Sequence, residues 1–164
     1  AIMYFAALSD THGYKLHTQR TVEILKSFDP VAVLHCGDIG SLQIPELLGQ
    51  WPTHYVCGNV DSRLKGLEAA ILQAGGIYHH EFGDITIEDL RIALLHSHIP
   101  QTLDKAIRGG LYDVVCYGHT HQAEYHMDAK TLVVNPGALY RARRHTIAIF
   151  ELGKKPPAIW HVEV

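Results

Sequence analysis

The sequence predicts an α/β domain in which two packed, mixed β-sheets are flanked by helices. Short apolar, β-branched runs alternate with segments of helical periodicity over most of the chain, which is typical of parallel strands joined by helices. Strand-like runs dominate the last third, and they predict antiparallel strands that extend the parallel ones. A chain of 164 residues has room for one such core but not for two. We therefore expect one domain over residues 1–164.

The first half of the chain is predicted to repeat a unit of strand, polar turn and helix. Each strand is a short apolar run, and each helix is indicated by apolar residues three or four positions apart. Pro30 ends the first helix, and Gly75-Gly76 ends the third. The predicted elements are, in order, strand 4–8, a helix containing Val22, Leu25 and Phe28, strand 31–34, helix 44–48, strand 55–57, and a helix containing Leu64, Leu67 and Ile71.

The second half is predicted to begin with a hairpin and to contain one further helix. Pro100 is a favourable first residue for that helix, and Gly109-Gly110 ends it. The remaining runs are strand-like. The predicted elements are hairpin strands 84–88 and 91–95, a helix containing Leu103 and Ile107, and strands 114–117, 123–127, 132–134, 146–152 and 158–162.

Polar side chains that can bind metals follow the apolar runs of this pattern. They lie within a few residues of the carboxyl ends of five separate predicted strands. Ligands of α/β sheets bind at that edge, and chance placement on surface loops would not repeat five times. Neighbouring glycines permit tight turns and a close approach of the backbone. The residues are Asp10, His12, Asp38, Asn59, His96, His98, His119 and His121.

The residue types in this set favour a site for two divalent metal ions. Imidazoles together with carboxylates suit Mn, Fe, Zn or Co, and no pair of cysteines has zinc-finger spacing. Without His98, seven candidate ligands remain. That number is too large for one tetrahedral ion and about right for two ions that share a carboxylate.

Taken in order, these residues resemble the calcineurin-like metallophosphoesterase superfamily, and in length and spacing its small single-domain prokaryotic phosphodiesterases. The resemblance runs from residue 9 to Asn135-Pro136-Gly137, which is most of the chain. Each piece is short, but the ordered set is specific. The pieces are Asp10-x-His12, Gly37-Asp38, Gly58-Asn59-x-Asp61, His96-x-His98 and Gly118-His119-x-His121.

The resemblance implies a four-layer α-β-β-α sandwich and a metal-dependent phosphoric ester hydrolase that acts on small phosphodiesters. It implies two divalent metal ions, with Mn first and Ni, Co, Zn, Fe or Mg as alternatives. A hydroxide that bridges the ions would attack the phosphorus. The implied ligands are Asp10, His12, Asp38 and His121 for one ion, and Asp38, Asn59, His96 and His119 for the other, with Asp38 shared.

Val60 departs from the pattern of this superfamily, in which many members carry a histidine at that position as proton donor to the leaving group. Valine cannot donate a proton, so Asp61 loses its part in that pair and is expected only to brace the turn. We expect His98 to be the catalytic acid instead, working beside the catalytic carboxylate of Asp38. The alternatives for His98 are a neighbour of the metal site and a hydrogen-bond donor to the substrate phosphate.

Each candidate ligand also has a purely structural interpretation. Asp10 is placed like the N-cap of the following helix. Asp38 and Asn59 stand beside glycine, as ordinary turn residues do. His119 and His121 could be polar residues at the end of a strand. The joint occurrence of all these residues, in family order, favours the metal site.

Composition narrows the classes of function. A net charge of −3 gives no strong nucleic-acid signal. No apolar run reaches the roughly 20 residues of a membrane span, and the first residues resemble a strand rather than a signal peptide. Three cysteines without paired spacing favour a cytoplasmic location. The one basic cluster, Arg141, Arg143, Arg144 and His145, is either a solvated loop or a clamp for phosphate.

Two other functions compete with the hydrolase. One is a catalytically silent scaffold that binds protein partners, as does one retromer subunit of eukaryotes that resembles this fold. A scaffold would be expected to have lost ligands, whereas every ligand position is filled here. The other is a nuclease for short oligonucleotides, against which the small size and negative charge count. Strand edges at the surface also leave room for a homo-oligomer.

Overall fold

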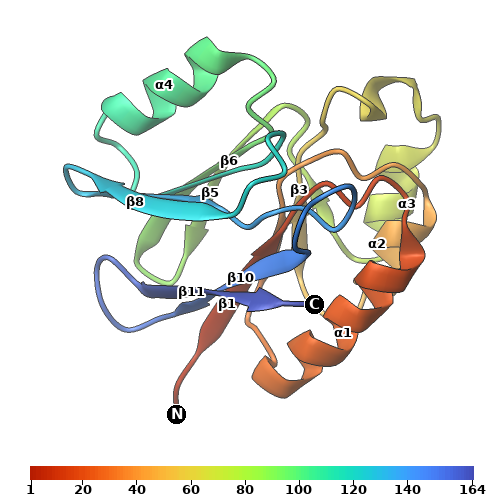
Figure 1. Cartoon of the computed structure of the whole chain (residues 1–164), viewed down its shortest axis with the longest axis horizontal. Helices are drawn as coiled ribbons and strands as arrows, with labels where there is room; N and C mark the ends of the chain where they lie inside the picture. The colour runs from red at the N-terminus through yellow and green to blue at the C-terminus, as the bar shows by residue number, and fades with distance from the viewer.

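Two mixed β-sheets packed face to face form the centre of the computed structural model, which describes residues 1–164 (Figure 1). The elements are β1 (Tyr4–Leu8), α1 (Lys15–Phe28), β2 (Val33–His35), α2 (Gln43–Leu47), β3 (Thr53–Tyr55), η1 (Asp61–Arg63), α3 (Leu67–Gln73), β4 (Ile77–Tyr78), β5 (Phe82–Ile87), β6 (Leu90–Leu95), α4 (Pro100–Arg108), β7 (Val114–Tyr117), β8 (Glu124–Asp128), β9 (Thr131–Asn135), β10 (Thr146–Glu151) and β11 (Ala158–Glu163).

Each sheet combines parallel strands with antiparallel ones. The first sheet has the order β11-β10-β1-β2-β3-β4, in which β1 to β4 are parallel and β10 and β11 are antiparallel additions. The second has the order β5-β6-β7-β9-β8, with β6, β7 and β9 parallel. The two sheets therefore each present a set of parallel strands whose carboxyl ends can carry ligands.

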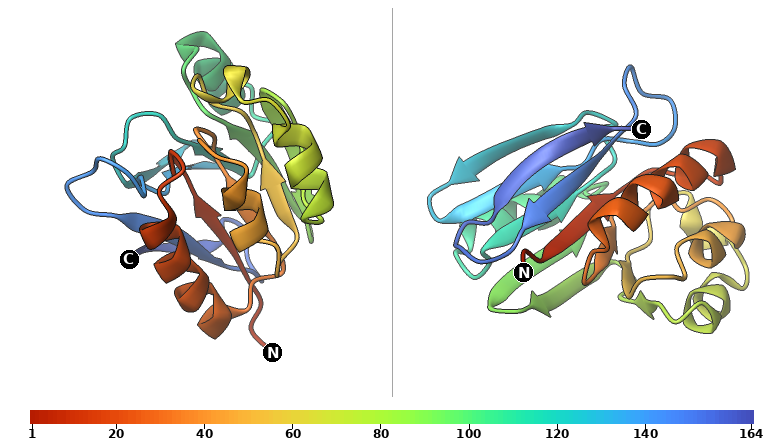
Figure 2. Two further views of the ribbon diagram at one scale, coloured as in Figure 1. Left: turned by 90° about the vertical axis from the view of Figure 1, so that its right-hand side faces the viewer. Right: turned by 90° about the horizontal axis from the view of Figure 1, so that it is seen from below.

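Helices cover the outer faces of both sheets. Helices α1, α2 and α3 lie on one side of the molecule and α4 lies on the other (Figure 1). Seen from below, the first three again lie together on one side of the sheets (Figure 2). The resulting order of layers is helix, sheet, sheet, helix, which is the expected four-layer sandwich. None of the helices combines the length and the apolar character that crossing a membrane requires.

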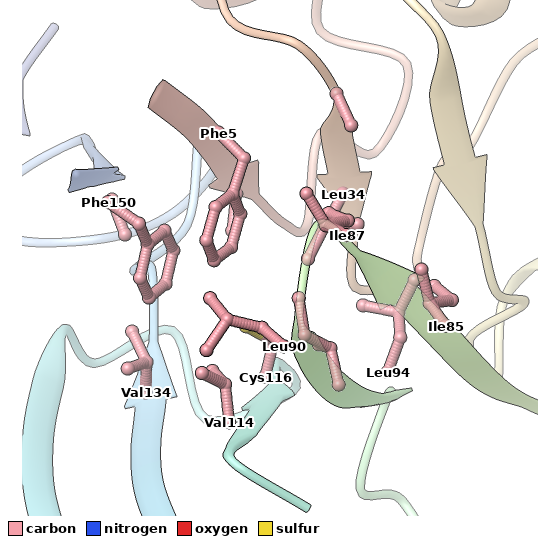
Figure 3. Packing of buried hydrophobic residues seen from close by; sticks show 14 of the residues in the cluster. Phe5, Leu34, Ile85, Ile87, Leu90, Leu94, Val114, Cys116, Val134 and Phe150 are labelled. Carbon is pink, nitrogen blue, oxygen red and sulfur yellow. The ribbon is translucent and has the colours of Figure 1, made fainter. Parts of the chain in front are cut away.

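The alternation of side chains along each strand builds three layers of core. In β1, Phe5 and Ala7 face the second sheet, while Ala6 and Leu8 face the helices. The ring of Phe5 stacks on that of Phe150 in β10, with centroids 4.2 Å apart (Figure 3). A third and smaller cluster lies between β6, β7 and α4. The inter-sheet core thus fixes how the two sheets, and their loops, face each other.

Some predicted elements differ in extent from those observed. The run 55–57 was expected to be a strand, but β3 ends at Tyr55, and the amides of Val56 and Cys57 bond to carbonyls of His35 and His80 instead. The strand expected at 31–34 is displaced to Val33–His35. Strand β4 has only two residues and shows no alternation that sequence reasoning could detect.

Candidate metal centre

Six of the seven predicted ligands form two groups at the carboxyl ends of the strands. Their ligand atoms lie within 4.8 Å of one another in each group. Both sheets contribute, so the expectation of a single shared sheet edge is replaced by two edges that face each other. The first group is Asp10, His12 and His121, and the second is Asp38, His96 and His119.

The carboxylate of Asp38 lies between the two groups. Its Oδ2 atom is 3.3 Å from Nε2 of His12 and 3.1 Å from Nε2 of His96. Its Oδ1 atom accepts a hydrogen bond from the amide of Val60. The side-chain oxygen of Asn59, the seventh predicted ligand, lies 3.1 Å from the same Nε2 atom of His96. Asp38 is therefore placed to serve both groups at once.

The side chain of Asp10 is buried and incompletely paired. Its Oδ2 atom accepts hydrogen bonds from the hydroxyl of Ser9 and the amide of His119. Its Oδ1 atom, 3.2 Å from Nε2 of His121, has no hydrogen-bond partner, and neither has Nε2 of His12. Helix α1 begins at Lys15, so Asp10 is not its N-cap. Buried polar atoms left unpaired in this way are unusual and point to an absent partner such as a cation.

Backbone carbonyls orient two of the histidines. The Nδ1 atom of His96 is 2.9 Å from the carbonyl oxygen of Cys36, and that of His121 is 3.2 Å from the carbonyl oxygen of Arg141. A carbonyl can only accept, so each Nδ1 carries a proton and each Nε2 faces the site as the atom that would bind a metal ion. Carboxylates and imidazoles held in this way fit a borderline divalent metal ion.

The two carboxylates control the protonation of the surrounding histidines. The carboxylates of Asp10 and Asp38, 3.6 and 3.3 Å from Nε2 of His12, raise the pKa of His12 to about 9. Burial alone would raise the pKa of Asp38, but His12 and His96 more than offset it and hold that pKa below its usual value. The carboxylates of the metal-free site thus attract positive charge. Protons on the histidines supply that charge in place of metal ions.

The backbone around the candidate ligands is strained. Five of the seven candidate ligands have positive φ angles, a conformation that non-glycine residues seldom adopt. They are Asp10, His12, Asp38, His119 and His121. Gly58 and Gly118 leave room for the carboxylates, because a Cβ atom at Gly58 would collide with Oδ1 of Asp38 and one at Gly118 would collide with Oδ2 of Asp10. Such strain is typical of functional sites.

Asp61 braces the loops of the site, as the sequence predicts. Its carboxylate accepts hydrogen bonds from the amides of Ile39, Gly40 and Gly58, at 2.9–3.0 Å. These amides belong to the loops that follow β2 and β3. Asp61 therefore holds the Asp38 loop and the Asn59 loop together.

His98 lies beside the second group without belonging to it. Its ring centroid is 5.6 Å from that of His96, and its Nδ1 atom is buried without a hydrogen-bond partner. The chain is not extended between them, because Ser97 has a φ of 77°. Strand alternation therefore does not explain why the two rings are close; a turn at Ser97 does.

The buried side chain of His35 supports the loops that carry the candidate ligands. Its Nδ1 atom accepts a hydrogen bond from the amide of Gly37, and its Nε2 atom lies 3.0 Å from the hydroxyl of Thr11. That hydroxyl donates to the carbonyl of Ile39, so Nε2 carries the proton of a neutral ring. Burial lowers the pKa of His35 to about 3.

The metal-free protein should accordingly lose stability as the pH falls from about 6.5 toward 3. The unfolded chain protonates His35 at the ordinary value, whereas the folded chain resists protonation. Between pH 7 and pH 5 the contribution of His35 amounts to about 2 kcal/mol. His35→Gln should therefore lose about 2 kcal/mol less than the wild type over this interval, measured by urea unfolding with a chelator present. Equal losses in both proteins would contradict this account.

Two neighbours of the site were not identified from the sequence. Ser9 donates to Asp10, and the ring of Tyr140 stacks on that of His12, with centroids 4.8 Å apart. Tyr140 belongs to the loop between β9 and β10, which lies beside the loop after β1 (Figure 1). A lone tyrosine in a loop carries no pattern that would mark it.

Comparisons with known proteins match this fold and identify its family. Residues 3–155 match the model of the calcineurin-like phosphoesterase superfamily domain. The chain is 32% identical over 160 residues to phosphodiesterase MJ0936 from Methanocaldococcus jannaschii, covering 93% of this chain and 95% of that protein. A solved structure of an archaeal phosphodiesterase superposes with a TM-score of 0.90 at 30% identity, covering 99% and 100% of the two chains.

The structure of vacuolar protein sorting 29 from Cryptosporidium parvum shares the fold, with a TM-score of 0.73 at 19% identity over 99% of each chain. The four-layer sandwich and the grouped carboxylates and imidazoles define a metal-dependent phosphoester hydrolase. The chain belongs to the calcineurin-like phosphoesterase superfamily.

Proposed function

We propose that this protein is a phosphodiesterase that hydrolyses small phosphodiesters with two divalent metal ions, Mn in the first place. The observation that carries the proposal is the position of Asp38, whose Oδ2 atom contacts His12 of one ligand group and His96 of the other. A single carboxylate between two sets of ligands is the arrangement that two neighbouring ions need.

The residues of the site would have three roles: they would hold the metal ions, orient the histidine rings, or donate a proton. Asp10, His12 and His121 would hold one ion, while His96, His119 and Asn59 would hold the other, with Asp38 shared. When bound, such ions lower the pKa of a water molecule and neutralise charge on the phosphoryl oxygens. The carbonyls of Cys36 and Arg141 keep His96 and His121 in the tautomer that faces the site.

His98 would donate a proton to the departing oxygen. The position that many relatives use for this step is occupied by Val60, whose amide only anchors Asp38. His98 has a buried Nδ1 atom without a partner and lies beside His96. It is thus the nearby imidazole that the ligand groups do not use.

The first test compares the activity of the protein on a phosphodiester with its activity on a phosphomonoester. We expect hydrolysis of bis-p-nitrophenyl phosphate to be at least comparable with that of p-nitrophenyl phosphate. A monoester dianion calls for several cations around its oxygens, and the chain has one modest arginine cluster. The relatives named as phosphodiesterases support the same choice. Both substrates would be assayed on chelator-treated protein reloaded with Mn, Ni, Co, Zn or Mg.

The chelator-treated protein without added metal is the control and should be inactive on both substrates. Robust turnover of the monoester without detectable cleavage of the diester, with all five metals, would overturn the choice of substrate. If neither substrate is hydrolysed with any of the five metals, the result would favour a catalytically silent scaffold that binds protein partners.

A further inference from the structure

A basic hollow opens beside the first ligand group. It has a volume of about 520 Å³ and lies between the loop after β7 and the loop that joins β9 to β10. Three arginines line it, and no aspartate or glutamate does. The polar residues that matter for its chemistry are Thr120, His121, Gln122, Arg141, Arg143 and Arg144.

The three guanidinium groups are free of carboxylate partners. Arg141, Arg143 and Arg144 are exposed and form no ion pair, whereas Arg91 and Arg108 each pair with an aspartate. The positive charge of the hollow is therefore not neutralised by the protein itself. Guanidinium groups bind phosphate through paired hydrogen bonds, which makes an unpaired cluster of them suited to that anion.

The hollow lies directly beside the first ligand group, and the two have His121 in common. His121 lines the hollow, and its Nε2 atom is 3.2 Å from Asp10 on the other side. The guanidinium carbon of Arg141 lies 5.2 Å from the centroid of the Tyr140 ring, which in turn stacks on His12. A phosphodiester at the ligand groups would thus direct one of its substituents into the arginine-lined space.

We propose that this hollow is a specificity subsite for a second phosphate group, carried by one substituent of the scissile phosphodiester. The inference rests on the proposed phosphodiesterase function and narrows its substrate class. The preferred substrates are small phosphodiesters with a second, terminal phosphate, such as a nucleotide ester that also bears a phosphate on its sugar. Arg141, Arg143 and Arg144 select that phosphate and take no part in bond breaking.

The test uses two substrates with the same scissile bond and the same leaving group. They are the p-nitrophenyl ester of thymidine 5′-phosphate and its analogue with an added 3′-phosphate. With the Mn-loaded protein we expect kcat/KM to be about tenfold or more higher for the 3′-phosphorylated ester, because a charged hydrogen bond contributes on the order of one such factor. The ratio should fall to near one in Arg141→Gln/Arg143→Gln/Arg144→Gln.

A charge-matched variant shows whether the position of the arginines matters. Arg108→Gln/Lys130→Gln/Lys154→Gln removes three positive charges outside the hollow and should keep the preference of the wild type. A second readout needs no turnover: the Kd of thymidine 3′,5′-bisphosphate against that of thymidine 5′-monophosphate, by calorimetry. The bisphosphate should bind about tenfold more tightly, and the arginine variant should lose this difference.

The outcomes separate the subsite from the proposed function. Hydrolysis of both esters at equal kcat/KM, with equal Kd values for the two nucleotides, would overturn the subsite and leave the phosphodiesterase standing. An equal loss of preference in the charge-matched variant would reduce the effect to net charge and also overturn it. If neither ester is hydrolysed, the proposed function fails, and the two Kd values still decide whether the hollow selects a second phosphate.

Discussion

Asp38→Asn should lower the occupancy of both metal positions and reduce kcat/KM on bis-p-nitrophenyl phosphate by more than about 10³-fold. Asparagine keeps the shape of the side chain but removes the charge that Oδ2 presents to both His12 and His96. Loss of that one carboxylate therefore weakens two sets of ligands. Metal content after equilibration with Mn, measured by mass spectrometry together with turnover, checks this.

Two further variants make the result specific to Asp38. His12→Ala should mainly empty one position, because His12 belongs to the first ligand group alone. Asp104→Asn changes an exposed carboxylate of α4 and should leave metal content and activity unchanged. A wild-type protein that holds no more than one ion per chain at saturating Mn would refute the shared carboxylate. So would an Asp38→Asn variant that still holds two.

His98→Ala should reduce kcat by about 10²–10⁴-fold on an alkyl or nucleoside diester while leaving metal content near that of the wild type. An alkoxide is a poor leaving group and needs the proton that His98 would supply. Nitrophenolate leaves without that help, so the loss on a nitrophenyl ester should be much smaller. The comparison requires kcat on both esters and metal analysis of the same preparation.

The matched control for this variant is His126→Ala, which removes an exposed histidine of β8. It should leave kcat unchanged on both esters. If His98→Ala instead loses activity equally on the two esters and also loses one metal ion, His98 belongs among the metal ligands. Its role as proton donor would then be excluded.

The sequence predicts most of the helices and long strands, because periodicity reports which face of an element is buried. The third helix was expected to contain Leu64, but α3 begins at Leu67 and Leu64 lies in extended backbone before it. The sequence predicts β3 poorly, because Val56 is buried in the core between the sheets although it lies beyond the end of the strand. It gives no sign of β4, because two residues cannot show a period. Sequence periodicity therefore detects residues buried at regular intervals along a helix or strand. It does not detect buried residues in loops or in very short strands.

The candidate ligands are recognisable because each follows a strand, but their division into two groups came from the family resemblance and not from their spacing. Which loops face each other depends on how two sheets pack, and sequence spacing holds no information on that. Tyr140 and the turn at Ser97 show the same limit. Their positions follow from contacts between segments far apart in the chain, which only the completed fold defines.

The pairing of β1 with β10 has a consequence for how the protein acquires its activity. Tyr4 lies opposite Glu151, so the strand that leads to Asp10 and His12 finds its antiparallel neighbour only after eight other strands have been made. During synthesis β1 leaves the ribosome well before β10 and must wait for it with one edge unpaired.

Contacts of such long range form slowly, because a large loop must close before they provide any stabilisation. The nascent chain therefore carries the first two ligands long before it can position them. Competence for catalysis arrives late in folding, after β10 has emerged. A truncated product that lacks β10 has an exposed apolar edge at β1 that invites aggregation.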